Sequence, residues 1–181
     1  VEPRHKVIFV DNMWEIGQAI HDQYYIEIEY EKTKNEKTII RKVKPAAILF
    51  SEYYFYMISF ATPELEREKF KRVEDSLLVI YRLDKIKNLK VLEERFQVPY
   101  AERFEEGEFR KRVQFMQNGP LQKVRFKYNG KSVEEVLDRI PTARVLQENE
   151  DGAIIEAEVF GDGIKMWIRS QGELISEVSY R

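Results

Sequence analysis

Two arginines stand out because each lies in a strand-like segment among apolar neighbours. Counting alternate residues places Arg41 on the same strand face as Ile39 and Val43. The same count places Arg82 on the face of Ile80. Each arginine requires an anion, because a buried guanidinium without a partner costs several kcal/mol. That anion is either a carboxylate of this chain or a bound ligand, and the planar fork of arginine suits phosphate.

Carboxylates of the chain itself are available to both arginines. Asp84 follows Arg82 by two residues and shares its strand face. Glu27 or Glu29 pairs with Arg41 if the two strand faces meet. The spacing therefore leaves two interpretations open for Arg41 and Arg82, an internal ion pair and a binding site for an anionic ligand.

The segment YYFYMISF, residues 53–60, opens with four consecutive aromatic residues. Alternation puts Tyr54, Tyr56 and Ile58 on one strand face and Phe55 and Met57 on the other. Neither face is polar, which predicts a strand covered on both sides, by a helix or by a second subunit. The alternative is that one or two of the tyrosines form a stacking surface for nucleic-acid bases.

Residues 15–98 show the pattern of one helix followed by a five-stranded antiparallel sheet. Apolar residues at helical spacing, Ile16, Ala19 and Ile20, predict a helix of about two turns. β-Branched and aromatic runs then predict strands in YYIEIEYE, TIIRKVKP, AILFSE, YYFYMISF and DSLLVIYRLDKIKNLKVLEE, with an interruption at Pro45. Such a set of strands favours closure into a small barrel, which removes exposed sheet edges.

The second half predicts a separate domain. A charged segment over 99–119 indicates a connecting helix that ends at the break NGP. Beyond it the order is strand, helix, strand, strand, helix, strand, which is typical of a ferredoxin-like βαββαβ sandwich. The fold class is therefore α+β. We expect a linker (1–14), a barrel domain (15–98), the connecting helix (99–119) and the ferredoxin-like domain (120–181).

Composition argues against several classes of protein. The 30 Lys and Arg are balanced by 32 Asp and Glu, so no broad surface for neutralising phosphates is expected. The chain has no cysteine, and His5 and His21 are too far apart for a local metal pair. Motifs of catalysis and of phosphate loops are absent, so we expect no enzyme, no catalytic residue, no metal and no cofactor. No apolar run is long enough to span a membrane, and we expect a cytoplasmic protein.

Taken in order, several segments of the chain resemble the WYL domain, a family named after a Trp-Tyr-Leu triplet on a central strand. The triplet corresponds here to FYM, residues 55–57. The helix EIGQAIHD, the strand IEIEY, the segment RKVKP and the segment YRLDKI follow in the family's order, with Lys85 where an arginine is usual and Val79 where another often lies. The segment MWIRSQG resembles the C-terminal extension of WYL proteins.

This resemblance implies a bacterial transcriptional regulator whose WYL domain has an Sm-like, SH3-type barrel and senses a ligand. It implies an upstream winged helix-turn-helix domain that contacts operator DNA, and the absence of an initiating Met fits a chain that lacks it. The implied effector is a nucleotide or short single-stranded nucleic acid. Carried onto this chain, the implied ligand-binding residues are Arg41, Tyr56, Arg82, Lys85 and, more weakly, Tyr30.

Three hypotheses of function follow. The first is a ligand-sensing module that forms a homodimer within a DNA-binding regulator. The second is a purely structural dimerisation module, in which Arg41 and Arg82 form internal ion pairs and no ligand binds. The third, a general RNA chaperone of the Sm type, ranks last because the composition provides no basic surface.

Overall fold

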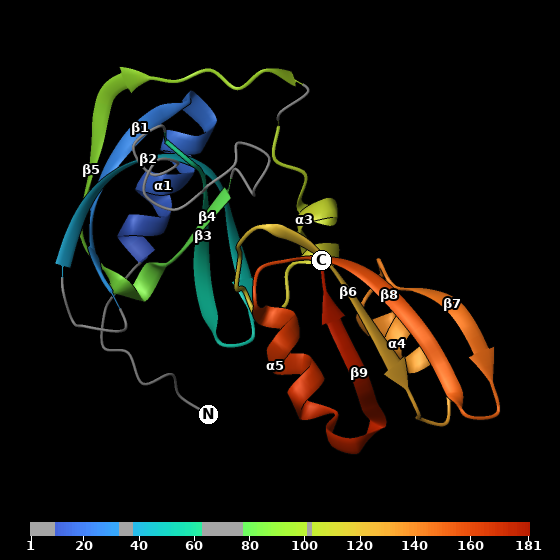
Figure 1. Cartoon of the computed structure of the whole chain (residues 1–181). Helices are drawn as coiled ribbons and strands as arrows, with labels where there is room; N and C mark the ends of the chain where they lie inside the picture. Colours follow the sequence, from blue (N-terminus) through green and yellow to red (C-terminus); the bar gives the residue numbers. More distant parts are fainter. Residues whose placement is uncertain (1–9, 33–37, 63–77, 101–102) are drawn as a thin grey trace. The chain divides into compact units, whose positions relative to one another are not determined.

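The computed structural model describes residues 10–32, 38–62, 78–100 and 103–181. Most of the predicted linker over 1–14, with His5, lies outside the described residues. The described part of the chain forms two compact units, one that ends at Phe104 and one formed by Glu105–Arg181. Each unit contains one antiparallel sheet and few helices, so the predicted α+β class is confirmed (Figure 1).

The first unit consists of a helix and a five-stranded antiparallel sheet with the order β4-β3-β2-β1-β5. Its elements are α1 (Val10–Asp22), β1 (Tyr24–Glu31), β2 (Thr38–Ser51), β3 (Tyr54–Phe60), β4 (Leu78–Arg82), the 3-10 turn η1 (Leu83–Lys85) and β5 (Ile86–Arg95). The predicted number of strands is correct, but two of the predicted boundaries are wrong. TIIRKVKP and AILFSE form one strand, β2, whereas the long run after Asp75 divides into β4 and β5.

Pro45 explains the first of these differences. Proline cannot donate to a β ladder, so it is tolerated inside a strand mainly at an irregularity. The pairing of β2 with β3 shifts register between Pro45 and Ala47, which is such an irregularity. The strand therefore continues through the proline, pairing with β1 up to Val43 and with β3 from Lys44 onward.

Helix α1 is longer than the predicted two turns and packs against the sheet. It spans 13 residues, and Ile16 and Ala19 are buried in the same core cluster as Ile26 and Ile28 of β1. Figure 1 shows α1 within the curve formed by β1, β2 and β5. The predicted apolar stripe is therefore the buried face of the helix.

Strand β3 is covered on its core-side face and only in part on the other, so the prediction of a strand covered on both sides holds in part. Met57 lies in the core cluster of the first unit and is 0% exposed. Its neighbour Ile58, on the opposite face of the strand, is also 0% exposed. Tyr54 and Tyr56 share the face of Ile58 but are half-exposed. This second face is therefore closed at Ile58 and accessible at the two tyrosines.

The second unit contains the predicted order of strands and helices. Its elements are α3 (Glu106–Arg112), β6 (Leu121–Tyr128), α4 (Glu134–Arg139), β7 (Arg144–Asn149), β8 (Gly152–Phe160), α5 (Gly163–Ser170), the 3-10 turn η3 (Gly172–Leu174) and β9 (Ile175–Tyr180). The four strands are antiparallel in the order β7-β8-β6-β9. One core cluster joins Val136 of α4 and Trp167 of α5 to Phe126 of β6.

The helix in the predicted connecting segment is shorter than expected. Among the residues described within 99–119, α3 is the only α-helix, and it ends where Val113 adopts an extended conformation and forms a bridge with Phe160. Phe115 and Met116 have φ values of 53° and 50°, which a right-handed helix cannot contain. None of the described helices is long and apolar enough to cross a membrane.

Candidate functional site

Arg82 lies at the centre of a cluster of aromatic and acidic side chains on β3, β4 and η1. It is the cross-strand partner of Tyr56, so the two side chains emerge on the same face of the sheet. Its guanidinium carbon lies 3.7 Å from the centre of the Tyr54 ring, within the range of a cation–π contact. The rings of Tyr54 and Tyr56 meet edge to face, with centroids 6.5 Å apart.

Asp84 holds the guanidinium of Arg82 in this position. Arg82 donates from Nε to Oδ1 at 3.0 Å and from Nη2 to Oδ2 at 2.7 Å, a bidentate pair. The pair forms because β4 ends at Arg82 and the turn η1, anchored by the fully buried Leu83, brings Asp84 back towards the strand. Hydrogen bonding to Asp84 raises the pKa of Arg82, so the guanidinium keeps its charge.

Asp84 is thus a partner of Arg82, as one of the two interpretations left open by the spacing expected, and a ligand contact of Arg82 stays a prediction. The apolar face that Arg82 shares with Leu78 and Ile80 is only partly buried, however. Val79 and Tyr81 are the buried residues of β4, whereas Leu78, Ile80 and Arg82 are half-exposed. The side chain of Asp84 is 7% exposed and that of Arg82 is 29% exposed. The Arg82 guanidinium is therefore partly accessible to a ligand.

Tyr30 lies beside the cluster and contacts it through its hydroxyl group. The hydroxyl accepts a hydrogen bond from the backbone N–H of Arg82 at 3.3 Å. The ring packs edge to face against Tyr81, with centroids 5.1 Å apart. Burial raises the pKa of Tyr30, and burial likewise raises that of Tyr56. Both hydroxyls are therefore neutral at physiological pH.

Lys85 is engaged by a carboxylate of the first strand. Its ammonium lies 3.1 Å from Glu31, and the ammonium of Lys87 lies 2.6 Å from the other oxygen of the same carboxylate. Hydrogen bonds from Lys87 and Lys85 lower the pKa of Glu31. This group of charges is thus fixed at neutral pH, at the end of β1 next to Tyr30.

Arg41 lies on a different strand pair from Arg82. It is the cross-strand partner of the fully buried Ile28, so it projects from the core-side face of β2, as its spacing predicted. Tyr30 is the partner of Ile39, which places Arg41 diagonally next to Tyr30 on that face. Arg41 is half-exposed. Its role as a ligand-binding residue stays a prediction.

Tyr54 is the residue that sequence reasoning left out of the candidate site. Its ring makes the closest aromatic contact with the Arg82 guanidinium. The signal for it was present, because alternation already placed Tyr54 on the face of Tyr56. The missing information was the pairing of β3 with β4, which places Arg82 opposite Tyr56.

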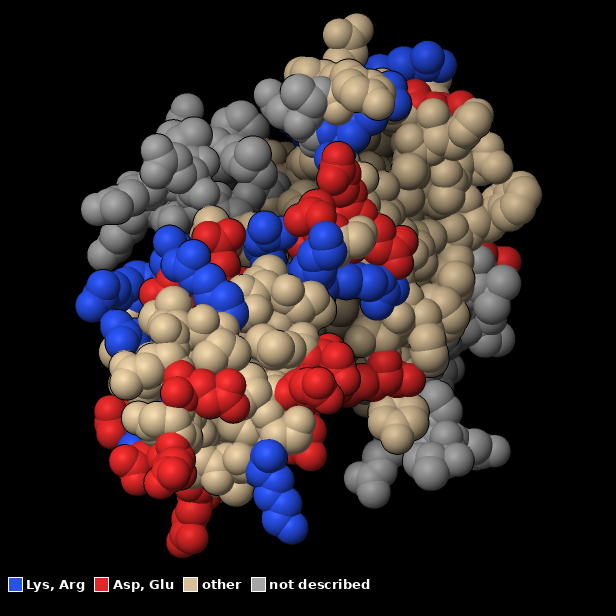
Figure 2. Space-filling model, turned by 90° about the vertical axis from the view of Figure 1, so that its right-hand side faces the viewer, with Lys and Arg blue, Asp and Glu red and all other residues tan. Residues whose placement is uncertain are grey.

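The cluster formed by Tyr54, Tyr56, Arg82 and Asp84, which we call the stacking cluster, combines flat surfaces with one oriented cation. Aromatic rings and guanidinium planes are the surfaces on which nucleic-acid bases stack. On the face drawn in Figure 2, Lys and Arg groups lie interspersed with Asp and Glu groups. The stacking cluster, with its single oriented cation, therefore suits a ligand with few phosphates.

Residues 11–91 match the family model of the WYL domain. The family that the sequence resembles is therefore confirmed, and the first unit of this chain is a WYL domain. The stacking cluster lies entirely within these residues.

Two solved structures are similar to this chain at low sequence identity. One is described as proteasome accessory factor B/C (PafBC) of Arthrobacter aurescens, with 14% identity and a TM-score of 0.46 over 92% of this chain and 24% of that one. The other is described as a CRISPR Cas-related protein, with 18% identity and a TM-score of 0.54 over 93% of this chain and 47% of that one. The chain thus spans less than half the length of either structure. No curated protein matches it.

Proposed function

We propose that this chain is the ligand-sensing and oligomerisation module of a DNA-binding transcriptional regulator. Its WYL domain binds a nucleotide or a short single-stranded nucleic acid at the stacking cluster. The observation that carries this proposal is the guanidinium of Arg82, stacked on Tyr54 and oriented by Asp84 beside Tyr56. Membership of the WYL family supports the regulatory role. The module acts by binding in the cytoplasm and catalyses no reaction.

The ligand is held by two kinds of contact. A base stacks on the tyrosines or on the open side of the guanidinium, which contributes about 1–3 kcal/mol per base. A phosphate accepts hydrogen bonds from the edge of Arg82, with Lys85, Arg41 and Tyr30 as further contacts from the neighbouring strands. Tyr56, the cross-strand neighbour of Arg82, provides a further contact surface on the same face of the sheet.

The fold proposed for each unit is consistent with this role. In the first unit, β2 pairs with β1 up to Val43 and with β3 from Lys44 onward, and η1 joins the outer strands β4 and β5. These features support an Sm-like, SH3-type barrel. In the second unit, the order β7-β8-β6-β9, with α4 and α5 sharing one core cluster, supports a ferredoxin-like sandwich.

Regulation requires that the ligand distinguish two arrangements of the regulator. A ligand that binds both arrangements equally shifts neither population, so its affinity must differ between them. We propose that a homodimer carries two upstream domains on operator DNA and that effector binding changes their relative placement.

The alternative function is a purely structural dimerisation module. The bidentate pair between Arg82 and the nearly buried Asp84 favours it, because such a pair satisfies the arginine without a ligand. In this case replacing Arg82 lowers stability and changes no binding property.

Fluorescence anisotropy of labelled single-stranded DNA and RNA oligonucleotides distinguishes the two functions. We expect Arg82→Gln to weaken binding at least about tenfold, equivalent to about 1.4 kcal/mol. The matched control is Arg95→Gln, because Arg95 also lies over a tyrosine, 4.6 Å from the centre of the Tyr24 ring, but outside the stacking cluster. This control should change the affinity less than about twofold.

The salt dependence of binding provides a second criterion. Each phosphate neutralised on a single strand contributes a slope of about −0.7 in log affinity against log salt. A local site predicts a total slope of no more than about −2. The proposed function is wrong if wild-type protein binds no oligonucleotide, or if both arginine variants weaken binding equally.

A further inference from the structure

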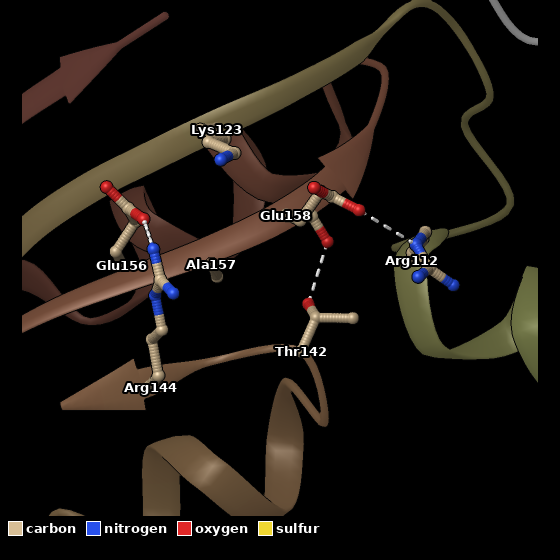
Figure 3. Close-up of a pocket in the computed structure, with 7 residues that line it drawn as sticks. All are labelled: Arg112, Lys123, Thr142, Arg144, Glu156, Ala157 and Glu158. Atoms are coloured by element: carbon tan, nitrogen blue, oxygen red, sulfur yellow. Dashed lines mark hydrogen bonds and ion pairs between the residues drawn. The ribbon is translucent and has the colours of Figure 1, made fainter.

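A second candidate site lies in the second unit, outside the residues of the WYL domain. It is an open pocket of about 300 Å³ at the β7 side of β8 (Figure 3). Its lining residues are Arg112, Lys123, Thr142, Arg144, Glu156, Ala157 and Glu158. The pocket forms because β8 continues to Phe160, whereas its pairing with β7 extends only from Gly152 to Glu156.

Three cations reach this pocket from three different elements. Lys123 comes from β6, Arg144 from the start of β7 and Arg112 from the end of α3. In Figure 3 the ammonium of Lys123 and the guanidinium of Arg144 approach from opposite sides of β8, and Arg112 approaches from the side of α3. Convergence of cations from separate elements distinguishes this pocket from a run of charges on a solvated strand.

Both guanidinium groups are held by glutamates. Arg144 pairs through Nη2 with Glu156 at 2.5 Å. Arg112 pairs through Nη1 with Glu108 at 2.7 Å and through Nε with Glu158 at 3.4 Å. The hydrogen bond from Arg144 lowers the pKa of Glu156, so both members of this pair are charged at neutral pH. The glutamates fix the direction of each guanidinium and already accept hydrogen bonds.

Several donors of these cations are unused within the described part of the chain. Arg144 engages only Nη2, and Arg112 leaves Nη2 unengaged. Among the described residues, no carboxylate lies within ion-pair distance of the Lys123 ammonium. An oxyanion in the pocket can accept hydrogen bonds from these groups without displacing Glu156 or Glu158.

The backbone of β8 adds one more donor. Lys123 exchanges both of its backbone hydrogen bonds with Arg181, on the β9 side of β6. Its partner across β6 and β8, Glu158, is therefore in a non-hydrogen-bonded position and directs its N–H and C=O away from β6. The hydroxyl of Thr142 donates to that C=O at 2.7 Å. The N–H of Glu158 consequently faces the side on which the pocket lies.

We propose that this pocket binds a small oxyanion, the phosphate or carboxylate group of a metabolite. The three cations and two glutamates of the lining give a net charge of +1, and Arg125 lies opposite Glu156 on the same face of the sheet. Oriented guanidinium forks, an ammonium and a backbone N–H are the donors that recognise oxyanions. A volume of about 300 Å³ admits a small metabolite.

The test is a titration of the ¹⁵N-labelled chain with inorganic phosphate and, separately, with succinate, followed by NMR. We expect a saturable shift of the Glu158 amide with a Kd of about 1 mM or lower for at least one probe. Lys123→Gln and Arg144→Gln should each raise that Kd at least about tenfold. Response to phosphate alone assigns a phosphate ligand, and response to succinate alone assigns a carboxylate.

The matched control is Lys127→Gln. Lys127 lies on β6 and on the same face as Lys123, four residues further along, but does not line the pocket. It should change the Kd less than about twofold. The proposal is overturned if neither probe gives a saturable shift, or if Lys127→Gln weakens binding as much as Lys123→Gln. Because the readout lies in the second unit, this result is independent of oligonucleotide binding by the WYL domain.

Discussion

At the scale of single residues, Asp84 determines what Arg82 can do. It accepts two hydrogen bonds from the guanidinium and so holds it over the Tyr54 ring. The sequence predicted this carboxylate as a partner, because both residues share a strand face at a spacing of two. It did not predict the stack on Tyr54, because this contact depends on how β3 pairs with β4.

Replacing Asp84 should therefore destabilise the first unit. We expect Asp84→Asn to lower the free energy of unfolding by about 1–3 kcal/mol, because it removes a charge-assisted pair that is mostly shielded from water. Urea unfolding provides the measurement. Glu94→Gln is the control, because Glu94 is 58% exposed in its pair with Lys42, and it should cost less than about 1 kcal/mol. Equal losses of unfolding free energy for the two substitutions would contradict a larger contribution of the Asp84 pair to stability.

Because the pKa of Tyr30 is raised, the stability of the first unit depends on pH in the alkaline range. Since burial raises this pKa above the ordinary 10.0, the unfolded chain loses the phenol proton at a lower pH than the folded protein. The stabilising contribution is complete below about pH 10 and is lost as the pH rises through the folded pKa. Tyr30→Phe should reduce the loss of stability between about pH 8 and about pH 11, measured by urea unfolding. Tyr53→Phe, at a residue that is 63% exposed, should leave that loss unchanged.

At the scale of elements, periodicity predicted most of the fold. Alternation and helical spacing gave the order of elements in the second unit and the five strands of the first. The predicted strand boundary at Pro45 was wrong because proline usually interrupts a strand. Here the register shift between Pro45 and Ala47 accommodates the proline, and the strand continues. The pocket on β8 could not be predicted, because it depends on where β7 begins relative to β8 and on the position of α3.

The start of α5 provides a test of packing between elements. A Cβ added to Gly163 would lie 2.0 Å from the backbone oxygen of Gln114, a contact that requires one backbone segment to move. We expect Gly163→Ala to destabilise the second unit by about 2–3 kcal/mol in thermal or urea unfolding.

Gly107 is the matched position for this substitution. It lies in α3, with no atom within 4 Å of an added Cβ. Gly107→Ala should leave stability unchanged or increase it by up to about 1 kcal/mol, because alanine favours the helix. A neutral effect of Gly163→Ala would contradict the close approach of α5 to Gln114.

At the scale of the whole molecule, the chain joins a WYL domain to a second α+β unit. The formal net charge is −2, so binding of a nucleic acid must rely on a local cluster and not on a basic surface. The stacking cluster in the first unit is the proposed place for a nucleic acid, and the pocket lined by Lys123 and Arg144 in the second unit is the proposed place for a small oxyanion. If the proposed function holds, two sites for different ligand groups allow the proposed regulator to combine two signals, provided that each ligand favours one arrangement of the proposed dimer.

The most direct test of the central claim is photochemical crosslinking of a bromouridine-containing oligonucleotide, followed by mass spectrometry of the crosslinked peptides. The proposed function predicts that the main crosslink lies on Tyr54 or Tyr56 and that Arg82→Gln reduces its yield, whereas Arg95→Gln does not. Crosslinks on Tyr24 or Tyr25 in place of the stacking cluster, or no crosslink at saturating protein, would contradict the claim that this cluster is the nucleic-acid site.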